Sequence, residues 1–168
     1  MPSYKRSKHT TARKRIMGRF RSMSEKRLAS ILRLKGIKFR YEKTQVSYSL
    51  RVKTKFKCDN CGSVGGRVER IYIPDFELSN GVYIEVKGRL LNADKRKLEA
   101  VKEQHPDLNL VLLFDSNNLL GGKNKNKARY GDWADKVGIP WAVKNPPEEW
   151  FKYADQPFDK PMTELTKI

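Results

Sequence analysis

Alternation of apolar and polar residues is the main pattern in the first half of the chain. Residues 46–56 place apolar side chains at almost every second position, which predicts a long, half-exposed strand. Residues 58–66 are rich in turn formers, and residues 68–73 return as a second strand. We therefore expect residues 46–73 to form a β-arm that projects from the body.

Helical spacing precedes this arm. Ser22 and Glu25 have the spacing of a capping box, which predicts the start of a helix, and Gly36 is expected to end it. The apolar stripe of this helix consists of Leu28, Ile31 and Leu32. A short strand is expected to follow, because its apolar residues alternate at Ile37, Phe39 and Tyr41.

The second half of the chain alternates between helices and strands. A helix is expected to begin at Asn92 or Asp94, with residues 95–97 exposed. Residues 108–114 are nearly all apolar and predict a buried central strand. The remaining predicted elements are a short helix over 133–137, a strand over 139–143 and a terminal helix opened by Pro146. This order predicts an α/β sandwich around a mixed sheet.

A β-hairpin is predicted between the arm and the second helix. Residues 71–76 and 82–87 are expected to pair as strands, because Asn80-Gly81 is a strong signal for a type I′ turn. Glu85 and Lys87 are two residues apart and should point to the same face of the sheet.

Asp75 can face Glu85 and Lys87 across this turn. Carboxylates are hard oxygen ligands suited to a divalent metal, and Lys87 can position or deprotonate a water or offset charge on a phosphate. A Pro-Asp pair followed ten residues after the Asp by an acid-x-Lys triplet is the signature of PD-(D/E)XK nucleases. The alternative is an acidic hairpin on a solvated sheet edge.

The net charge of the chain helps to choose between a nuclease site and a solvated acidic hairpin. The chain has 36 Lys and Arg residues against 19 Asp and Glu residues, a formal net charge of +17 over 168 residues. Such an excess favours a polyanionic partner, unless the basic surface serves solubility or belongs to a ribosomal-type protein. Clustered carboxylates repel phosphate unless a metal bridges them, which argues against a purely structural RNA binder.

The basic residues are concentrated at the N-terminus. Residues 1–21 carry many cations and no acid, so we expect a flexible basic N-terminal arm followed by one domain over 22–168. No apolar run approaches the length of a membrane span, and no signal-peptide pattern follows the N-terminus.

Cys58 and Cys61 form one Cys-x-x-Cys motif, which is half of a zinc site. The chain has no second cysteine pair, and its only histidines are His9 and His105. The two cysteines are therefore reduced thiols in a loop, ligands of a zinc ion shared with other residues or a second chain, or a disulfide.

Short motifs on both sides of the acidic hairpin occur in the order found in a known family. They are Phe20-Arg21-Ser22 with Glu25 behind it, Lys35-Gly36-Ile37-Lys38-Phe39 with Tyr41-Glu42, Pro74-Asp75-Phe76, Asn80-Gly81, Glu85-Val86-Lys87-Gly88, Asp94-Lys95-Arg96-Lys97, Gln104-His105-Pro106, Gly138-Ile139 and Glu149-Trp150. Through these motifs the chain resembles the phage endonuclease I family, the Holliday-junction-resolving nucleases of T-seven-like phages. The resemblance covers most of the chain after the basic arm.

This resemblance implies roles for individual residues. Asp75, Glu85 and the backbone carbonyl of Val86 would hold Mg²⁺ or Mn²⁺, and Lys87 is the motif lysine. Glu25 would help to hold a second ion, so that each active site has two. Capping of the first helix is the other role open to Glu25, and both roles can hold.

The resemblance also implies an intertwined homodimer. The first helix and strand of one chain would pack on the core of the other, joined by a β-bridge that corresponds to residues 46–70. This segment is longer than in the family and contains the Cys-x-x-Cys tip. The expected fold is α/β, a PD-(D/E)XK nuclease-like mixed β-sheet flanked by helices, with a projecting β-arm.

The expected function is resolution of four-way junctions and other branched DNA, in phage recombination, DNA processing or host DNA breakdown, in the cytoplasm of the infected bacterial cell. The alternatives are another PD-(D/E)XK endonuclease, of mismatch or restriction type, and a non-catalytic basic nucleic-acid-binding protein. We expect neither a membrane partner nor a small-molecule cofactor. The residues assigned to DNA contact are Lys5, Arg6, Arg13, Lys14, Arg15, Arg19, Arg21, Lys95, Arg96 and Lys97.

Overall fold

The computed structural model describes residues 20–57, 64–120 and 128–158. In chain order its elements are α2 (Met23–Leu34), β1 (Phe39–Tyr41), β2 (Val46–Lys57), β3 (Val64–Tyr72), β4 (Phe76–Leu78), β5 (Tyr83–Lys87), α3 (Asn92–Gln104), β6 (Leu110–Phe114), α4 (Tyr130–Val137), β7 (Trp141–Val143) and the 3-10 turn η1 (Glu148–Phe151). Nearly all of the basic N-terminal arm, the Cys-x-x-Cys tip and most of the loop before α4 lie outside the described residues.

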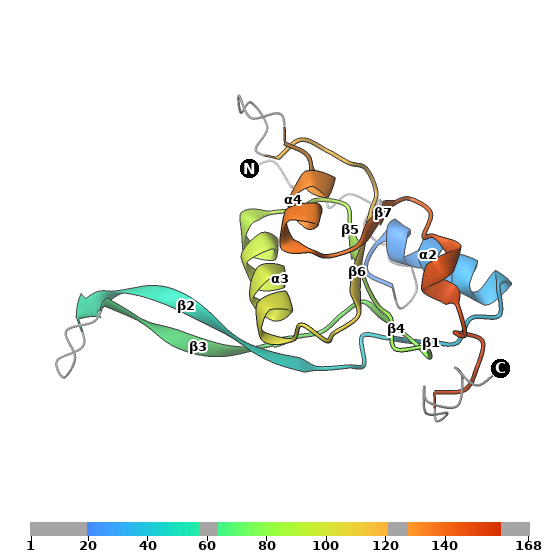
Figure 1. The fold of residues 1–168 in the computed structure, drawn as a ribbon, viewed down its shortest axis with the longest axis horizontal. Helices are drawn as coiled ribbons and strands as arrows, with labels where there is room; N and C mark the ends of the chain where they lie inside the picture. The colour runs from blue at the N-terminus through green and yellow to red at the C-terminus, as the bar shows by residue number, and fades with distance from the viewer. Residues whose placement is uncertain (1–19, 58–63, 121–127, 159–168) are drawn as a thin grey trace, which may run out of the picture.

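Five strands form the central sheet in the order β1-β4-β5-β6-β7. β4 runs antiparallel to β1 and β5, whereas β5, β6 and β7 are mutually parallel. Helices α3 and α4 lie on one side of this sheet, and α2 and η1 lie on the other (Figure 1). The predicted mixed sheet flanked by helices is therefore confirmed.

Each face of the sheet has its own hydrophobic core, which explains the nearly continuous apolar run of β6. Leu110, Leu112 and Phe114 pack with the buried residues of α3 and α4. Val111 and Leu113 point the other way and pack with α2 and η1. A strand with both faces covered needs apolar residues at every position, as predicted.

β2 and β3 form a separate two-stranded sheet, the β-arm, which extends away from the body (Figure 1). Their antiparallel pairing begins at Val46 and Tyr72 and continues toward the tip. At the root, Tyr48 and Tyr72 are buried in the same core as α3. The predicted arm is confirmed, and its root is anchored by two aromatic side chains.

The turn between β4 and β5 is not the predicted type I′ turn. Leu78 accepts a hydrogen bond from Gly81 N at 3.0 Å, and its own N–H donates to Val82 O at 2.8 Å. Gly81 has φ +81°, but Asn80 does not have the positive φ that a type I′ turn requires at both central positions. The connection is thus a three-residue loop that ends in a left-handed glycine.

The environment of Asn80 explains this difference. Its buried side-chain amide donates to Trp150 O at 3.0 Å and to Lys152 O at 2.9 Å. Asn80 therefore ties the hairpin to the C-terminal segment, a tertiary contact that the local sequence could not show.

Three element predictions also need correction. Residues 71–76 do not form one strand, because β3 ends at Tyr72 in the arm and β4 begins at Phe76 in the central sheet. Helix α4 begins at Tyr130, three residues earlier than expected, and the terminal helix is only the single turn η1. Within the described ranges, no helix is both long and apolar enough to span a bilayer.

Candidate active site

Asp75, Glu85 and Lys87 meet beside the central strand of the sheet. Lys87 Nζ lies 2.7 Å from Glu85 Oε1, so the two side chains share a face as predicted. Asp75 lies in the segment that crosses from the arm to the sheet, and its Oδ2 accepts a hydrogen bond from Val86 N at 2.7 Å. The backbone of β5 thus positions Asp75 beside Glu85 and Lys87.

Glu85 is only 3% exposed and is held by three side chains. Its Oε1 contacts Lys87 and also Lys97, whose Nζ lies at 3.4 Å. Its Oε2 accepts a hydrogen bond from the Tyr72 hydroxyl at 2.8 Å. Both carboxylate oxygens are therefore oriented before any ligand binds.

Helix α3 contributes to this site, which the sequence interpretation missed. Lys97 was expected to be exposed, but its side chain is half-buried against Glu85, and its Nζ lies 5.1 Å from the centre of the Tyr72 ring. Asp94 Oδ1 lies 3.3 Å from Lys87 Nζ. The signal was present, because Asp94 and Lys97 are three residues apart, next to the inward-facing Leu98.

Glu25 is buried near the start of α2. Its backbone N–H donates to Ser22 Oγ at 3.1 Å, which confirms half of the predicted capping box. Its carboxylate does not complete the box and instead accepts hydrogen bonds from Tyr41 OH at 2.6 Å and Arg21 N at 2.8 Å. From the sequence, Tyr41 was assigned to a strand and to a family motif but was given no role at the site.

The electrostatics of the site set the protonation of its groups. Burial, and then the charge of Glu85, raise the pKa of Asp75 to about 7; the Val86 N–H lowers it, the charge of Glu25 raises it further and Lys87 lowers it. Glu25 is thus within electrostatic reach of Asp75 in the same chain. The site concentrates more negative charge than it neutralises.

Lys87 remains a cation in this environment. Burial lowers the pKa of Lys87, but the charges of Glu85, Asp94 and Asp75 outweigh that effect and raise it. An ammonium group offers positive charge and hydrogen-bond donors to a phosphate, whereas it cannot take a proton from water. Of the roles considered for Lys87, stabilisation of charge on a phosphate fits this protonation state of the metal-free chain.

Asp75 and Glu85 suit a divalent cation. In the part of the chain that the structure describes, no three His, Cys, Asp or Glu side chains are grouped closely enough to form a metal cage. Two carboxylates and a backbone carbonyl nevertheless match Mg²⁺, which is usually bound through one or two carboxylates and keeps several waters. A cation would also offset the burial and the repulsion by Glu85 that together raise the pKa of Asp75.

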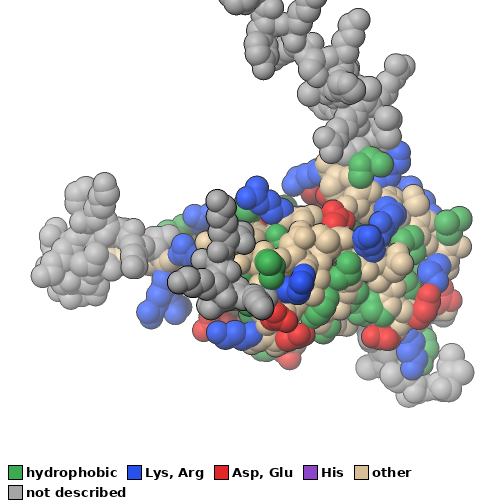
Figure 2. Space-filling view, turned by 90° about the horizontal axis from the view of Figure 1, so that it is seen from above, with side chains coloured by type: hydrophobic (Ala, Val, Ile, Leu, Met, Phe, Trp, Pro, Cys, Tyr) green, Lys and Arg blue, Asp and Glu red, His purple; other side chains and the backbone are tan. Residues whose placement is uncertain are grey.

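Most of the residues assigned to DNA contact lie in residues 1–19, outside the described ranges. Of the others, Arg21 forms an ion pair with Glu42 at 3.0 Å, and Arg96 donates to the backbone oxygen of Arg51 at 3.3 Å. Figure 2 shows Lys and Arg side chains near the root of the β-arm and over the adjoining face of the body.

Comparisons with known proteins show the family of the chain. The sequence model of a family described as Phage endonuclease I matches residues 6–166. "Endonuclease I" of Escherichia phage T7 is 34% identical over 148 residues, which cover 87% of this chain and 89% of the relative. "Endodeoxyribonuclease 1" of Enterobacteria phage T3 is 34% identical over 143 residues, with 84% of each chain covered.

Proposed function

The chain belongs to the phage endonuclease I family, and on that premise we propose that it is a divalent-metal-dependent endonuclease that cuts four-way junctions and other branched DNA. The observation that carries the proposal is the half-buried Asp75 and the buried Glu85 beside the ammonium group of Lys87. Such a cluster has no use in a protein that only binds nucleic acid, because two carboxylates close together would repel the phosphates.

Asp75, Glu85 and the carbonyl of Val86 would hold Mg²⁺ or Mn²⁺, and Glu25 would help to hold a second ion. When bound, the ions supply Lewis-acid stabilisation of the reacting phosphate. The reaction is hydrolysis of a phosphodiester, in which a water oxygen forms a bond to phosphorus while one phosphorus–oxygen ester bond breaks.

The side chains around Glu85 contribute orientation and charge. Lys87, held between Glu85 at 2.7 Å and Asp94 at 3.3 Å, offsets the negative charge that grows on the phosphate oxygens in the transition state. Tyr72 fixes the second oxygen of Glu85. Positioning of this kind is needed because a carboxylate that rotates freely cannot hold an ion in one geometry.

The proposed functional unit is an intertwined homodimer of PD-(D/E)XK nuclease-like subunits, whose two active sites cut two strands of one junction. Selectivity for branched DNA would come from shape, since no helix of the described fold has the features of a base-reading element. The long β-arm supports this proposal, because a two-stranded element can connect two bodies.

The decisive experiment compares Mg²⁺-dependent nicking of a four-way junction with that of a linear duplex of the same sequence. We expect rapid cleavage of the junction, slow cleavage of the duplex and no cleavage in EDTA. Equal cleavage of both substrates would identify a general nuclease instead. Tight binding without cleavage of either would identify a non-catalytic nucleic-acid-binding protein.

A further inference from the structure

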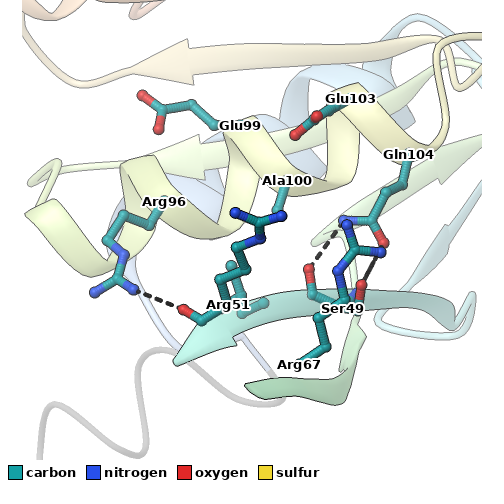
Figure 3. A pocket seen from close by; sticks show the side chains of 9 residues that line it. Ser49, Arg51, Arg67, Arg96, Glu99, Ala100, Glu103 and Gln104 are labelled. Carbon is teal, nitrogen blue, oxygen red and sulfur yellow. Dashed lines mark hydrogen bonds between the residues drawn. The ribbon is translucent and has the colours of Figure 1, made fainter. Parts of the chain in front are cut away.

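A basic groove lies between the β-arm and α3. One hollow in it, of about 550 Å³, is lined by Arg51 of β2, Arg67 of β3 and Arg96 of α3. We call these three residues and the surface between them the arginine groove. Arg96 also donates to the backbone oxygen of Arg51 at 3.3 Å, so the helix and the arm are joined at this point (Figure 3).

Among the described residues, neither Arg51 nor Arg67 has a carboxylate partner. Arg51 and Arg67 are directly opposite each other on the paired strands, and both side chains reach toward α3 (Figure 3). Like charges in this position destabilise a sheet unless something compensates them. None of the ion pairs among the described side chains includes either arginine.

Two acids, Glu99 and Glu103, also line the hollow against three arginines, and neither forms an ion pair with them in the described part of the chain. Glu99 accepts a hydrogen bond from Trp133 Nε1 at 2.7 Å, which turns its carboxylate toward α4. Glu103 lines the hollow without forming an ion pair to Arg51, Arg67 or Arg96 in the described part of the chain. The groove therefore retains an excess of positive charge.

Hydrogen bonds between α3 and β2 hold the two sides of the groove in place before any ligand binds. Gln104 of α3 donates to Ser49 O at 2.9 Å and accepts from Ser49 N at 2.8 Å, so its amide pairs with the edge of β2 in both directions. His105 Nε2 lies 2.6 Å from Ser47 O. A preformed site loses little conformational entropy when it binds a ligand.

The groove leads to the proposed active site. A second hollow of about 340 Å³ shares Leu50 and Arg96 with the first and extends along α3 to Asp94 and Lys97. Lys97 contacts Glu85, one of the proposed metal ligands. A polymer that presents a phosphate at Glu85 can thus continue into the arginine groove.

We propose that the arginine groove binds the sugar–phosphate backbone of the DNA strand that leads away from the cut phosphodiester. Guanidinium groups match phosphate oxygens in charge and in hydrogen-bond geometry. The inference rests on the proposed function, because nucleic acid is the occupant only if the adjoining site cuts nucleic acid. An acidic protein is less suitable, since nothing would then connect the groove to Glu85.

The test uses the full chain carrying Asp75→Asn, so that bound DNA is not cut. Fluorescence anisotropy gives the affinity for a labelled four-way junction between about 50 and about 300 mM KCl. Arg51→Gln/Arg67→Gln should weaken binding and flatten the logarithmic salt dependence by about 2, one unit for each lost phosphate contact. Arg51→Lys/Arg67→Lys should keep most of the slope, because it keeps the charge.

The matched control is Lys38→Gln/Lys152→Gln, which removes the same charge at positions next to β1 and η1 in the sequence. These two elements lie away from the projecting β-arm (Figure 1). It should leave the slope unchanged. The proposal would be wrong if Arg51→Gln/Arg67→Gln kept the salt slope of the parent. It would also be wrong if the control lost as much of that slope. Thermal melting shows whether each variant is folded. Junction cleavage by the unmodified chain tests the proposed function separately, so a failure of the groove proposal can be told apart from a failure of the proposed function.

Discussion

Lys97 Nζ lies 3.4 Å from Glu85 Oε1, although the two residues belong to different elements, α3 and β5. The same oxygen contacts Lys87 at 2.7 Å. A divalent cation that binds this oxygen must displace at least one ammonium group. Lys87 would keep Asp94 as a partner, whereas Lys97 would keep only the face of the Tyr72 ring. Lys97 is therefore the group expected to move.

Lys97→Met should increase the apparent metal affinity. Removing one positive charge beside Glu85 should lower the Mg²⁺ concentration for half-maximal cleavage about threefold to tenfold, an effect of roughly 1 kcal/mol. The measurement is a Mg²⁺ titration of single-turnover junction cleavage at saturating enzyme. Lys102→Met is the control, because Lys102 lies farther along the same helix and contacts Pro106 O. Equal Mg²⁺ midpoints in the two variants would contradict the idea that Lys97 and the metal ion compete for Glu85.

The sequence predicted the acids of the site but not their partners. Glu85 and Lys87 share a face because strand residues alternate, a local rule that held. Lys97 was placed on the solvent side of its helix because a charged residue is usually exposed. That interpretation failed because burial of Lys97 depends on a carboxylate twelve residues earlier, and helix periodicity alone does not contain that information.

The same limit applies to the β4–β5 turn. Asn80-Gly81 correctly predicted a reversal of the chain, since Gly81 adopts a left-handed conformation. The turn type was wrong because the Asn80 side chain is bonded to carbonyl groups some 70 residues later. Local turn preferences are weaker than these two tertiary hydrogen bonds, and only the folded chain shows where those bonds are made.

Single substitutions at the acidic hairpin should separate cleavage from binding. Asp75→Asn, Glu85→Gln and Lys87→Ala should each lower the cleavage rate by about 100-fold or more, because each removes charge from the reacting phosphate or its ions. Junction affinity should stay near that of the parent, since the basic surface carries it. Gel shift and cleavage assays on the same samples measure both. Asp107→Asn is the matched control for an exposed acid, and retained cleavage in any hairpin variant would remove that residue from the mechanism.

Asp75 should reduce the stability of the metal-free protein at high pH. Its pKa is about 7 in the folded chain against an ordinary value of 3.8. Between these values the folded state binds more protons than the unfolded state, so the free energy of unfolding falls as pH rises. In EDTA, Asp75→Asn should therefore stabilise the protein by up to about 4 kcal/mol at pH 8 and hardly at all near pH 4.

Thermal melting across this pH range checks that prediction. Addition of Mg²⁺ at pH 8 should raise the melting temperature of the parent but not of Asp75→Asn, because the ion relieves the repulsion only where the carboxylate exists. Asp107→Asn should show no comparable pH dependence. A stabilisation by Asp75→Asn that is the same at every pH would mean that the charge of Asp75 is not its cause.

The connection between β1 and β2 bears on the proposed dimer. In the single chain, α2 and β1 pack on their own sheet, and β2 pairs with β3 of the same chain. Glu42, where β1 ends, has φ +49°, a left-handed conformation that costs energy for a residue with a side chain. An extended link would relieve that strain and carry α2 to a second body with the same contacts. Exchange of identical elements is a low-cost route to a dimer.

Mixed dimers decide whether this exchange occurs. If α2 is exchanged, each active site takes Glu25 from one subunit and Asp75, Glu85 and Lys87 from the other. In a heterodimer of a Glu25→Ala chain and a Glu85→Ala chain, one site then receives both lesions and the other receives none. We expect this heterodimer to nick one strand of a junction at nearly the parental rate per intact site, while both homodimeric variants are inactive. If each site is built within one chain, both sites carry a lesion and cutting is lost. An inactive heterodimer, with its composition verified by mass, would show that α2 stays on its own sheet.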